Sequence, residues 1–193
     1  MKILDIIIPT YNRKYELYSM IASLAAQTKN NWRAVIVIDD LYSSGKHKEV
    51  DNIIEQFPDK PIHVVYSNKR YNDWGHTPRE IGKRISKADY LLLTGDDNYY
   101  VPTFIESISN AMEEGNDFIY WDMVHSHYNY QYFNCEPRTH KIDMGAFCVK
   151  RELAQQIQLK TNFAADGDYV EDFKKKFPNA KMKKINKILF VHN

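Results

Sequence analysis

This sequence of 193 residues has few of the features that would place it outside the cell or within a membrane. Its two cysteines, Cys135 and Cys148, are too few for a disulfide framework, which favours a reducing compartment. Its hydrophobic runs stay well short of the roughly 20 residues that span a bilayer. The acidic residue Asp5 comes too early for a signal peptide. These absences predict a cytoplasmic protein.

The chain also lacks an excess of charge of either sign, because 26 basic and 25 acidic residues leave a formal net charge of +1. A dedicated nucleic-acid binder usually carries a strongly basic face, so we expect no nucleic-acid partner. Hydrophobic residues make up 44% of the chain and aromatic residues 13%, which argues against a disordered protein. The composition predicts a single globular domain over residues 1–193.

Glycine is scarce, and its seven positions supply none of the common phosphate-binding loops. The patterns G-x-G-x-x-G and G-x-x-x-x-G-K are both missing, which argues against dinucleotide oxidoreductases and P-loop phosphotransferases. The hydrolase pattern G-x-S-x-G and the metalloprotease pattern H-E-x-x-H are missing too. If the protein binds phosphate, a divalent metal held by carboxylates has to neutralise much of its charge.

What the sequence does contain is a regular alternation of two hydrophobic patterns. Continuous apolar runs predict buried strands, and apolar residues three or four apart predict helices between them. Such alternation predicts an α/β fold, a mostly parallel sheet with helices on both faces. Between 124 and 139 the alternation fails, and we expect a loop or a small antiparallel excursion. The predicted strands are 3–8, 32–38, 62–66, 90–93, 118–121, 146–149 and 185–191, and the later predicted helices are 102–112, 153–159 and 169–177.

Polar side chains follow four of the predicted strands, at the edge where open parallel sheets bind their ligands. These segments are 9–13, 39–40, 67–70 and 94–98. They bring four carboxylates to one edge of the sheet, and the repulsion between these costs energy unless a cation or a hydrogen-bonding ligand offsets it. The pattern predicts a ligand site at this edge.

The same segments resemble the family 2 glycosyltransferases, which are inverting enzymes of the Rossmann-like GT-A fold with nucleotide-sugar donors. The resemblance begins with residues 6–13, Gln27, Thr28, Trp32 and 35–40. Residues 79–82 are similar to the family's Arg-Asn-x-Gly, with Glu80 as a departure, and 93–102 stand where the family has its metal-binding D-x-D. Residues 142–145 and 167–169 resemble the acceptor-side and catalytic-base segments. The resemblance implies a nucleotide-sugar-binding half, about 1–100, and an acceptor-side half, about 101–193.

On the donor side, the resemblance implies that Asp96 and Asp97, together with His192, hold Mn²⁺ or Mg²⁺ across the donor diphosphate. Thr94 replaces the first carboxylate of the common family pattern, so the direct ligand is either Asp97, our first choice, or Asp96. The residues expected to bind the nucleotide sugar are Pro9, Thr10, Tyr11, Arg13, Asp39, Asp40, Asn68, Arg79 and Asp96.

On the acceptor side, the resemblance implies that Asp168, or Asp166 in its place, is the catalytic base and that Asp143 orients the acceptor. The predicted activity is the metal-assisted transfer of a sugar, with inversion, from a nucleotide donor to an acceptor hydroxyl on a glycan, a lipid-linked sugar or another molecule, as in polysaccharide biosynthesis. A UDP-sugar is the first choice of donor.

Two other functions stay open at this stage: a catalytically silent nucleotide-sugar-binding module and a nucleotidyltransferase. The second normally needs a Gly- and Lys-rich loop after the first strand, which residues 9–12 do not supply. Seven lysines between 174 and 187 fit either a solvated face or peripheral contact with the inner face of a membrane.

Overall fold

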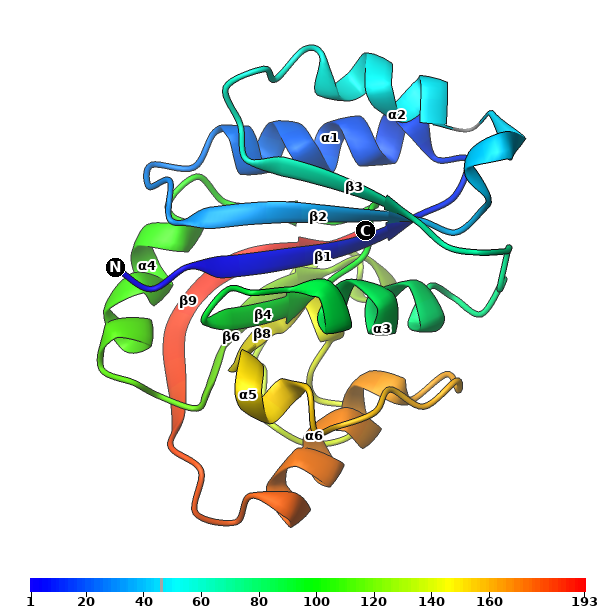
Figure 1. Cartoon of the computed structure of the whole chain (residues 1–193). Coiled ribbons are helices and arrows are strands. Elements are labelled where there is room, and N and C mark those ends of the chain that lie inside the picture. The colour runs from blue at the N-terminus through cyan, green and yellow to red at the C-terminus, as the bar shows by residue number, and fades with distance from the viewer. Residues whose placement is uncertain (46) are drawn as a thin grey trace.

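The computed structural model describes residues 1–45 and 47–193, and in them one sheet of nine strands forms the centre of the molecule (Figure 1). The strands are β1 (Leu4–Thr10), β2 (Trp32–Ile38), β3 (Ile62–Tyr66), β4 (Tyr90–Leu93), β5 (Tyr99–Tyr100), β6 (Phe118–His125), β7 (Gln131–Phe133), β8 (Phe147–Lys150) and β9 (Met182–His192). The α-helices are α1 (Lys14–Ala25), α2 (His47–Ile54), α3 (His76–Ile85), α4 (Phe104–Glu113), α5 (Arg151–Ala154) and α6 (Ala165–Lys176).

The strand order is β3-β2-β1-β4-β8-β6-β9-β5, with β7 paired to β6. Parallel pairs join β3, β2, β1 and β4, and a further parallel pair joins β6 to β9. The antiparallel strand β8 lies between β4 and β6. The predicted α/β class with a mostly parallel sheet is therefore confirmed, and the antiparallel excursion expected after residue 124 is the pairing of β6 with β7.

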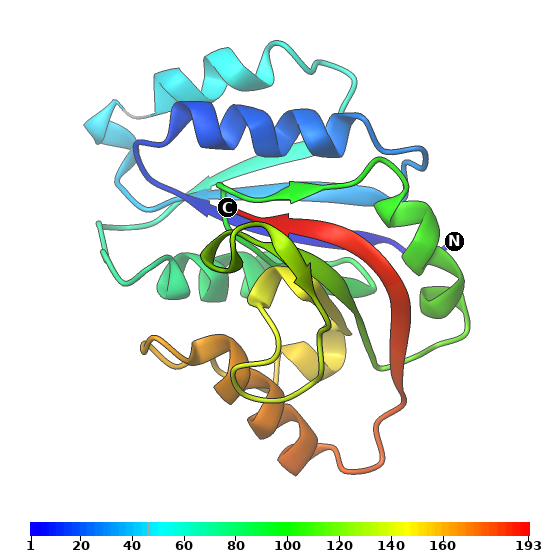
Figure 2. The same cartoon turned by 180° about the vertical axis from the view of Figure 1, so that it is seen from behind.

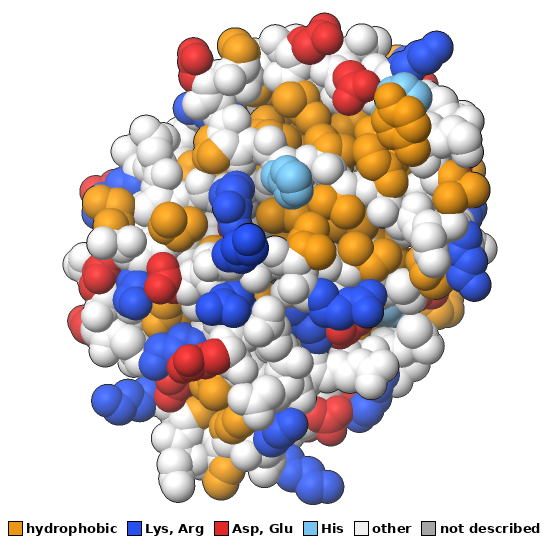
Figure 3. Space-filling view, viewed as in Figure 1, with side chains coloured by type: hydrophobic (Ala, Val, Ile, Leu, Met, Phe, Trp, Pro, Cys, Tyr) orange, Lys and Arg blue, Asp and Glu red, His pale blue; other side chains and the backbone are white. Residues whose placement is uncertain are grey.

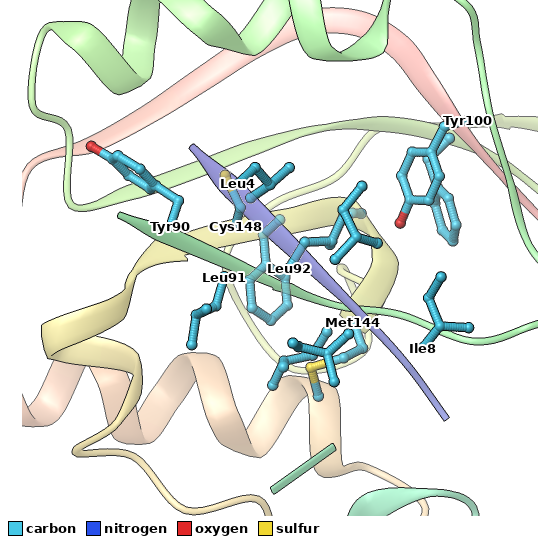
Figure 4. Close-up of a cluster of buried hydrophobic side chains, with 14 of the residues drawn as sticks. Leu4, Ile8, Tyr90, Leu91, Leu92, Tyr100, Met144 and Cys148 are labelled. Carbon is cyan, nitrogen blue, oxygen red and sulfur yellow. The ribbon is translucent and has the colours of Figure 1, made fainter. Parts of the chain in front are cut away.

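Helices cover both faces of the sheet, as the sequence predicts. Figures 1 and 2 show α1, α2 and α4 on one face and α3, α5 and α6 on the other. All seven residues of β1 are buried, because this central strand is covered on both sides. Figure 4 shows Leu4, Leu92 and Cys148, from three neighbouring strands, in one cluster of buried side chains. In the view of Figure 3, hydrophobic side chains also reach the surface over β2 and β3.

Helix α3 lies unusually close to the sheet at Gly82. A Cβ atom at this position would overlap the Cγ2 atom of Ile7 in β1. Glycine is therefore required here by close packing, and this close approach fixes the amino end of α3 beside the carboxyl end of β1.

Several predicted boundaries were wrong, including the end of β6, which is at His125 rather than at 121, and the start of β9, which is at Met182 rather than at 185. Helix α4 begins at Phe104 rather than at 102, after the short unpredicted strand β5, and α6 begins at Ala165 rather than at 169. The helix predicted over 153–159 is the single turn α5, which ends at Ala154.

The reason for the early end of α5 is a set of contacts with α3. The carbonyl of Ile157 accepts a hydrogen bond from Lys83 Nζ at 2.5 Å, and the amide of Leu159 donates to Glu80 Oε1 at 2.8 Å. Glu80 also pairs with Lys83 at 2.6 Å. Side chains of α3 thus take the backbone groups that a longer helix would have used, and the departure of Glu80 from the family pattern has a structural role.

Both cysteines are free and buried. Among the helices of the described residues, none has the length and apolar character needed to cross a membrane.

Candidate functional site

A cavity of about 520 Å³ opens at the carboxyl ends of β1, β2 and β4. This is the edge at which the sequence predicts a ligand site. The loop between β3 and α3 forms one wall. The cavity is lined by Pro9, Thr10, Tyr11, Arg13, Asp39, Arg70, Asn72, Trp74, Gly75, Arg79, Gly95, Asp96 and Asp97.

Most of the residues predicted to bind the donor line this cavity, but Asp40 and Asn68 are not among them. Asp40 accepts a hydrogen bond from the amide of Leu41, and Asn68 accepts one from the hydroxyl of Tyr71. Arg70 lies in the segment 67–70, which the sequence predicted at this edge without naming Arg70 as a binding residue. Asn72 and Trp74 were not predicted, because their positions depend on the path of a loop.

The Asp39 carboxylate fixes the path of that loop. Its two oxygens accept hydrogen bonds from the amides of Tyr71, at 2.9 Å, and Asn72, at 3.0 Å. The guanidinium of Arg70 then lies 3.3 Å from the centre of the Tyr11 ring, a cation–π contact that forms a planar wall of the cavity. Asp39 is therefore both a lining residue and a residue that positions the loop.

The carboxylates of Asp96 and Asp97 both contact the guanidinium group of Arg13. Arg13 Nη1 lies 2.5 Å from Asp97 Oδ2 and 3.3 Å from Asp96 Oδ1. Asp96 is buried and accepts a hydrogen bond from Thr10 Oγ1 at 2.7 Å. Burial raises the pKa of Asp96 to about 6, in spite of the Thr10 hydrogen bond and the charge of Arg13.

This acid pair has the character of a site for Mg²⁺ or Mn²⁺. Both ions prefer hard oxygen ligands, and Mg²⁺ commonly takes one or two carboxylates and completes its shell with phosphate oxygens and water. The Arg13 contact demonstrates that both carboxylates can reach one cation. The two aspartates therefore fit the expected metal when a diphosphate is bound.

His192, the third expected metal ligand, has other partners. Its ring stacks on His125 with 4.1 Å between centroids, its Nδ1 is 3.1 Å from Ser126 Oγ, and its Nε2 is 3.8 Å from Asp143 Oδ2. Within residues 1–45 and 47–193, no three His, Cys, Asp or Glu side chains converge as metal ligands. The predicted trio is thus not assembled by the protein alone.

Arg79 lines the cavity and is held there by two backbone carbonyls. Its Nε donates to the carbonyl of Thr94 at 3.0 Å, and its Nη1 donates to the carbonyl of Trp74 at 2.9 Å. Burial lowers the pKa of Arg79, while the charges of Asp143, Asp96 and nearby acids oppose that shift. A guanidinium in this position favours bound anions.

The two candidate bases at the amino end of α6 have different surroundings. Asp168 accepts a hydrogen bond from Asn162 Nδ2 at 2.9 Å and lies 3.7 Å from Lys160 Nζ. Burial raises the pKa of Asp166 to about 6, and the charge of Asp143 adds to that shift. Asp166 is therefore the carboxyl group that shares the electrostatic environment of Asp143, which in turn accepts a hydrogen bond from the amide of Gly145 at 2.7 Å.

Comparison with known proteins decides the family. The sequence profile described as "Glycosyl transferase family 2" matches residues 5–168. The chain belongs to glycosyltransferase family 2. A glycosyltransferase from Haemophilus influenzae is 33% identical over 141 residues, which are 70% of this chain and 45% of that protein. The poly(ribitol-phosphate) beta-N-acetylglucosaminyltransferase TarP of Staphylococcus aureus is 29% identical over 117 residues, which are 60% of this chain and 35% of TarP.

Solved structures confirm the GT-A type of fold for this family 2 member. Residues 1–349 of S. aureus TarS in complex with UDP-GlcNAc match with a TM-score of 0.77 at 15% identity, over 99% of this chain and 58% of that one. The mannosyltransferase PcManGT of Pyrobaculum calidifontis, in complex with GDP-Man and Mn²⁺, matches with a TM-score of 0.73 at 16% identity, over 99% and 56%. The chain spans less than half the length of the two curated relatives.

Proposed function

We propose that this family 2 glycosyltransferase moves a sugar, with inversion, from a nucleotide-sugar donor to an acceptor hydroxyl, and that a UDP-sugar is the donor. The cavity supports the donor site because it combines the Tyr11–Arg70 wall with Arg13 and Arg79 beside the acid pair. Relatives of the same fold are complexed with UDP-GlcNAc and with GDP-Man, which supports a nucleotide-sugar donor. The observation that carries the proposal is the convergence of Arg13, Asp96 and Asp97 in this cavity, with Arg79 in the same lining.

In the proposed reaction Asp166 is the general base, in preference to Asp168, whose carboxylate is held by Asn162 and Lys160. The acceptor hydroxyl gives its proton to an Asp166 carboxylate oxygen while the acceptor oxygen bonds to the anomeric carbon. The bond between that carbon and the diphosphate oxygen breaks on the opposite face, and the diphosphate leaves with the electron pair. A base with a pKa near the working pH suits this role.

The leaving diphosphate gains negative charge, and cationic groups of the protein stabilise it. Arg79 is held at the centre of the site by its two backbone contacts, and Arg13 reaches the same point as the acid pair. Asp96 and Asp97 would hold Mn²⁺ or Mg²⁺, which supplies further charge neutralisation at the diphosphate.

Asp166→Asn tests the base, and Asp168→Asn, two residues away on the same helix, is its matched control. We expect Asp166→Asn to lower kcat about 10²- to 10⁴-fold while the affinity for UDP, measured by calorimetry with Mn²⁺, stays unchanged. Asp168→Asn should lower kcat far less. Collapse of transfer in Asp168→Asn with normal turnover in Asp166→Asn would reverse the assignment.

The broader proposal fails if the wild-type protein binds UDP but neither transfers nor hydrolyses the sugar of any UDP-sugar. That result would favour a nucleotide-sugar-binding module.

Peripheral membrane contact through the lysine-rich segment stays a prediction. Lys184 in β9 is engaged with Asp122 at 2.8 Å, whereas Lys183 and Lys187 are exposed on the same strand.

A further inference from the structure

Trp74 is exposed at the rim of the cavity in a backbone conformation that tryptophan seldom adopts. Its side chain is 75% exposed, whereas Trp32 and Trp121 are 2% and 0% exposed. Its φ angle of 56° lies in the left-handed region, which is strained for a bulky residue. Such a conformation persists only where the surrounding structure imposes it, and strained residues of this kind cluster at ligand sites.

Contacts on both sides of Trp74 impose this conformation. Its carbonyl accepts the hydrogen bond from Arg79, and the carboxylate of Asp73 accepts a hydrogen bond from the amide of Thr77 at 3.0 Å. The next residue, Gly75, has a φ of 78°, and a Cβ there would lie 2.8 Å from the Pro9 side chain. Contacts with β1 and α3 therefore fix the backbone of Trp74, and its exposed indole lies at the rim of the cavity.

His76 connects Trp74 to the loop that carries the catalytic-base segment. The rings of Trp74 and His76 meet edge to face, with 6.2 Å between centroids, and the buried His76 hydrogen-bonds the backbone of Asn162. Phe163, the residue after Asn162, is 93% exposed. Figure 1 shows the loop before α3 and the loop before α6 projecting on the same side of the molecule. Trp74 thus lies on the loop beside the cavity, and Phe163 lies on the loop that His76 contacts.

We propose that Trp74 and Phe163 form an acceptor platform on which a pyranose ring of the acceptor stacks, with one of its hydroxyls directed toward Asp166. This inference rests on the proposed glycosyl transfer. The C–H groups on one face of a pyranose form an apolar surface that packs on the negative face of an aromatic ring. An open-chain polyol has no such flat face, so the platform selects cyclic sugars as the acceptor class.

The positions of Tyr11 and Arg70 separate this platform from the nucleotide end of the cavity. These two side chains already form a stacked pair in the cavity that Asp39, one of the residues predicted to bind the nucleotide sugar, also lines. Trp74 instead lies next to Arg79 and His76, whose contacts lead to Thr94 and to Asn162.

Fluorescence tests the platform without any turnover. Trp74 is the exposed member of the three tryptophans, so acrylamide quenching of the full chain reports mainly on its indole. With UDP and Mn²⁺ bound, we expect methyl β-D-glucopyranoside or methyl N-acetyl-β-D-glucosaminide to protect Trp74 from acrylamide, and ribitol to give no protection. The Trp74→Phe variant should lack the response while it binds UDP normally by calorimetry. Absence of protection by both pyranosides, or equal protection by ribitol, overturns the platform.

Kinetics supply a second, independent test. Trp74→Ala should raise the KM for a pyranoside acceptor about three- to tenfold, and Trp74→Phe should restore most of the loss. The KM for the donor should change less than the KM for the acceptor. Tyr15→Ala is the matched control, because Tyr15 is also 75% exposed but lies on α1.

The outcomes separate failure of the platform from failure of the proposed function. An unchanged acceptor KM in Trp74→Ala overturns the platform while transfer stands. A loss of UDP affinity in Trp74→Ala also overturns it, because the indole would then belong to the donor site. If the wild-type chain transfers no sugar but pyranosides protect Trp74, the platform stands as a binding site and the proposed transfer fails.

Discussion

At the scale of single residues, the site is a balance between acids and two arginines. Asp96 and Asp166 both have a pKa raised to about 6 by burial, so each carries a charge that its surroundings stabilise poorly. Arg13 and Arg79 offset part of this cost through contacts that also fix loops of the cavity. Groups with perturbed pKa values in a cleft are characteristic of functional sites.

The raised pKa of Asp166 predicts the pH dependence of transfer. The carboxyl group must be ionised to accept a proton, and its raised pKa keeps it protonated below about pH 6. We expect kcat/KM to reach a plateau above this pH and to fall at least tenfold per pH unit below it, because Asp96 becomes protonated in the same range. The measurement is a pH–rate profile from pH 4.5 to 8.5 on the wild-type protein and on Asp168→Asn, which should give the same curve. A profile that stays flat down to pH 5 would exclude Asp166 as the base.

Residue types and strand ends were sufficient to predict most of the residues that line the cavity. Asp39, Asp96 and Thr10 follow apolar runs, and the carboxyl ends of parallel strands must share one edge. Trp74 could not be found in this way, because its place depends on positive φ angles and on hydrogen bonds from distant residues. The sequence alone did not decide whether Asp166 or Asp168 is the catalytic base. Their surroundings differ because of tertiary contacts, which the sequence does not reveal.

At the scale of elements, α3 is the helix that connects the donor and acceptor sides. Gly82 brings it against β1, Arg79 reaches into the cavity, and Glu80 and Lys83 hold residues 157–159. The apolar spacing of residues 153–159 predicted a longer helix. A hydrophobic pattern indicates which side chains are buried, but it does not show which groups the backbone forms hydrogen bonds with. Tertiary contacts decided where α5 ends.

Glu80→Gln tests the contribution of the buried pair on α3. Lys83 is only 2% exposed, so loss of the Glu80 charge leaves its buried ammonium bonded to the neutral carbonyl of Ile157, and we expect a destabilisation of about 3 kcal/mol. Glu171→Gln is the matched control, since Glu171 and Lys174 form an exposed pair at the same i,i+3 spacing, and we expect at most about 0.5 kcal/mol. Urea unfolding measures both. Equal losses of stability in the two variants would show that burial does not make the Glu80–Lys83 pair contribute more than the exposed pair.

At the scale of the whole molecule, one sheet joins the two halves that the sequence suggested. Strand β4 of the first half pairs with β8 of the second, and the amide of Thr28 donates to the carbonyl of Pro102. Side chains cross the same boundary, because the Gln27 amide nitrogen donates to the carbonyl of Val101 at 2.9 Å. The donor cavity and Asp166 are thus parts of one packed body.

This continuity predicts a single cooperative unfolding transition. Trp32 lies in β2 and Trp121 in β6, so each reports on one half, and Trp74→Phe removes the exposed fluorophore. In urea, the fluorescence of variants that retain only Trp32 or only Trp121 should change together with the circular dichroism of the same variant. Loss of Trp121 fluorescence before the circular dichroism changes would instead indicate two separately folding halves.

The contact between Arg13 and the acid pair has a practical consequence for handling this protein. Because a side chain of the polypeptide already supplies the counter-ion for Asp96 and Asp97, the chain can reach its native shape in chelating buffers. For the proposed metal-assisted transfer, we expect EDTA to abolish turnover without lowering the melting temperature, because the ion would bind together with the nucleotide rather than during folding.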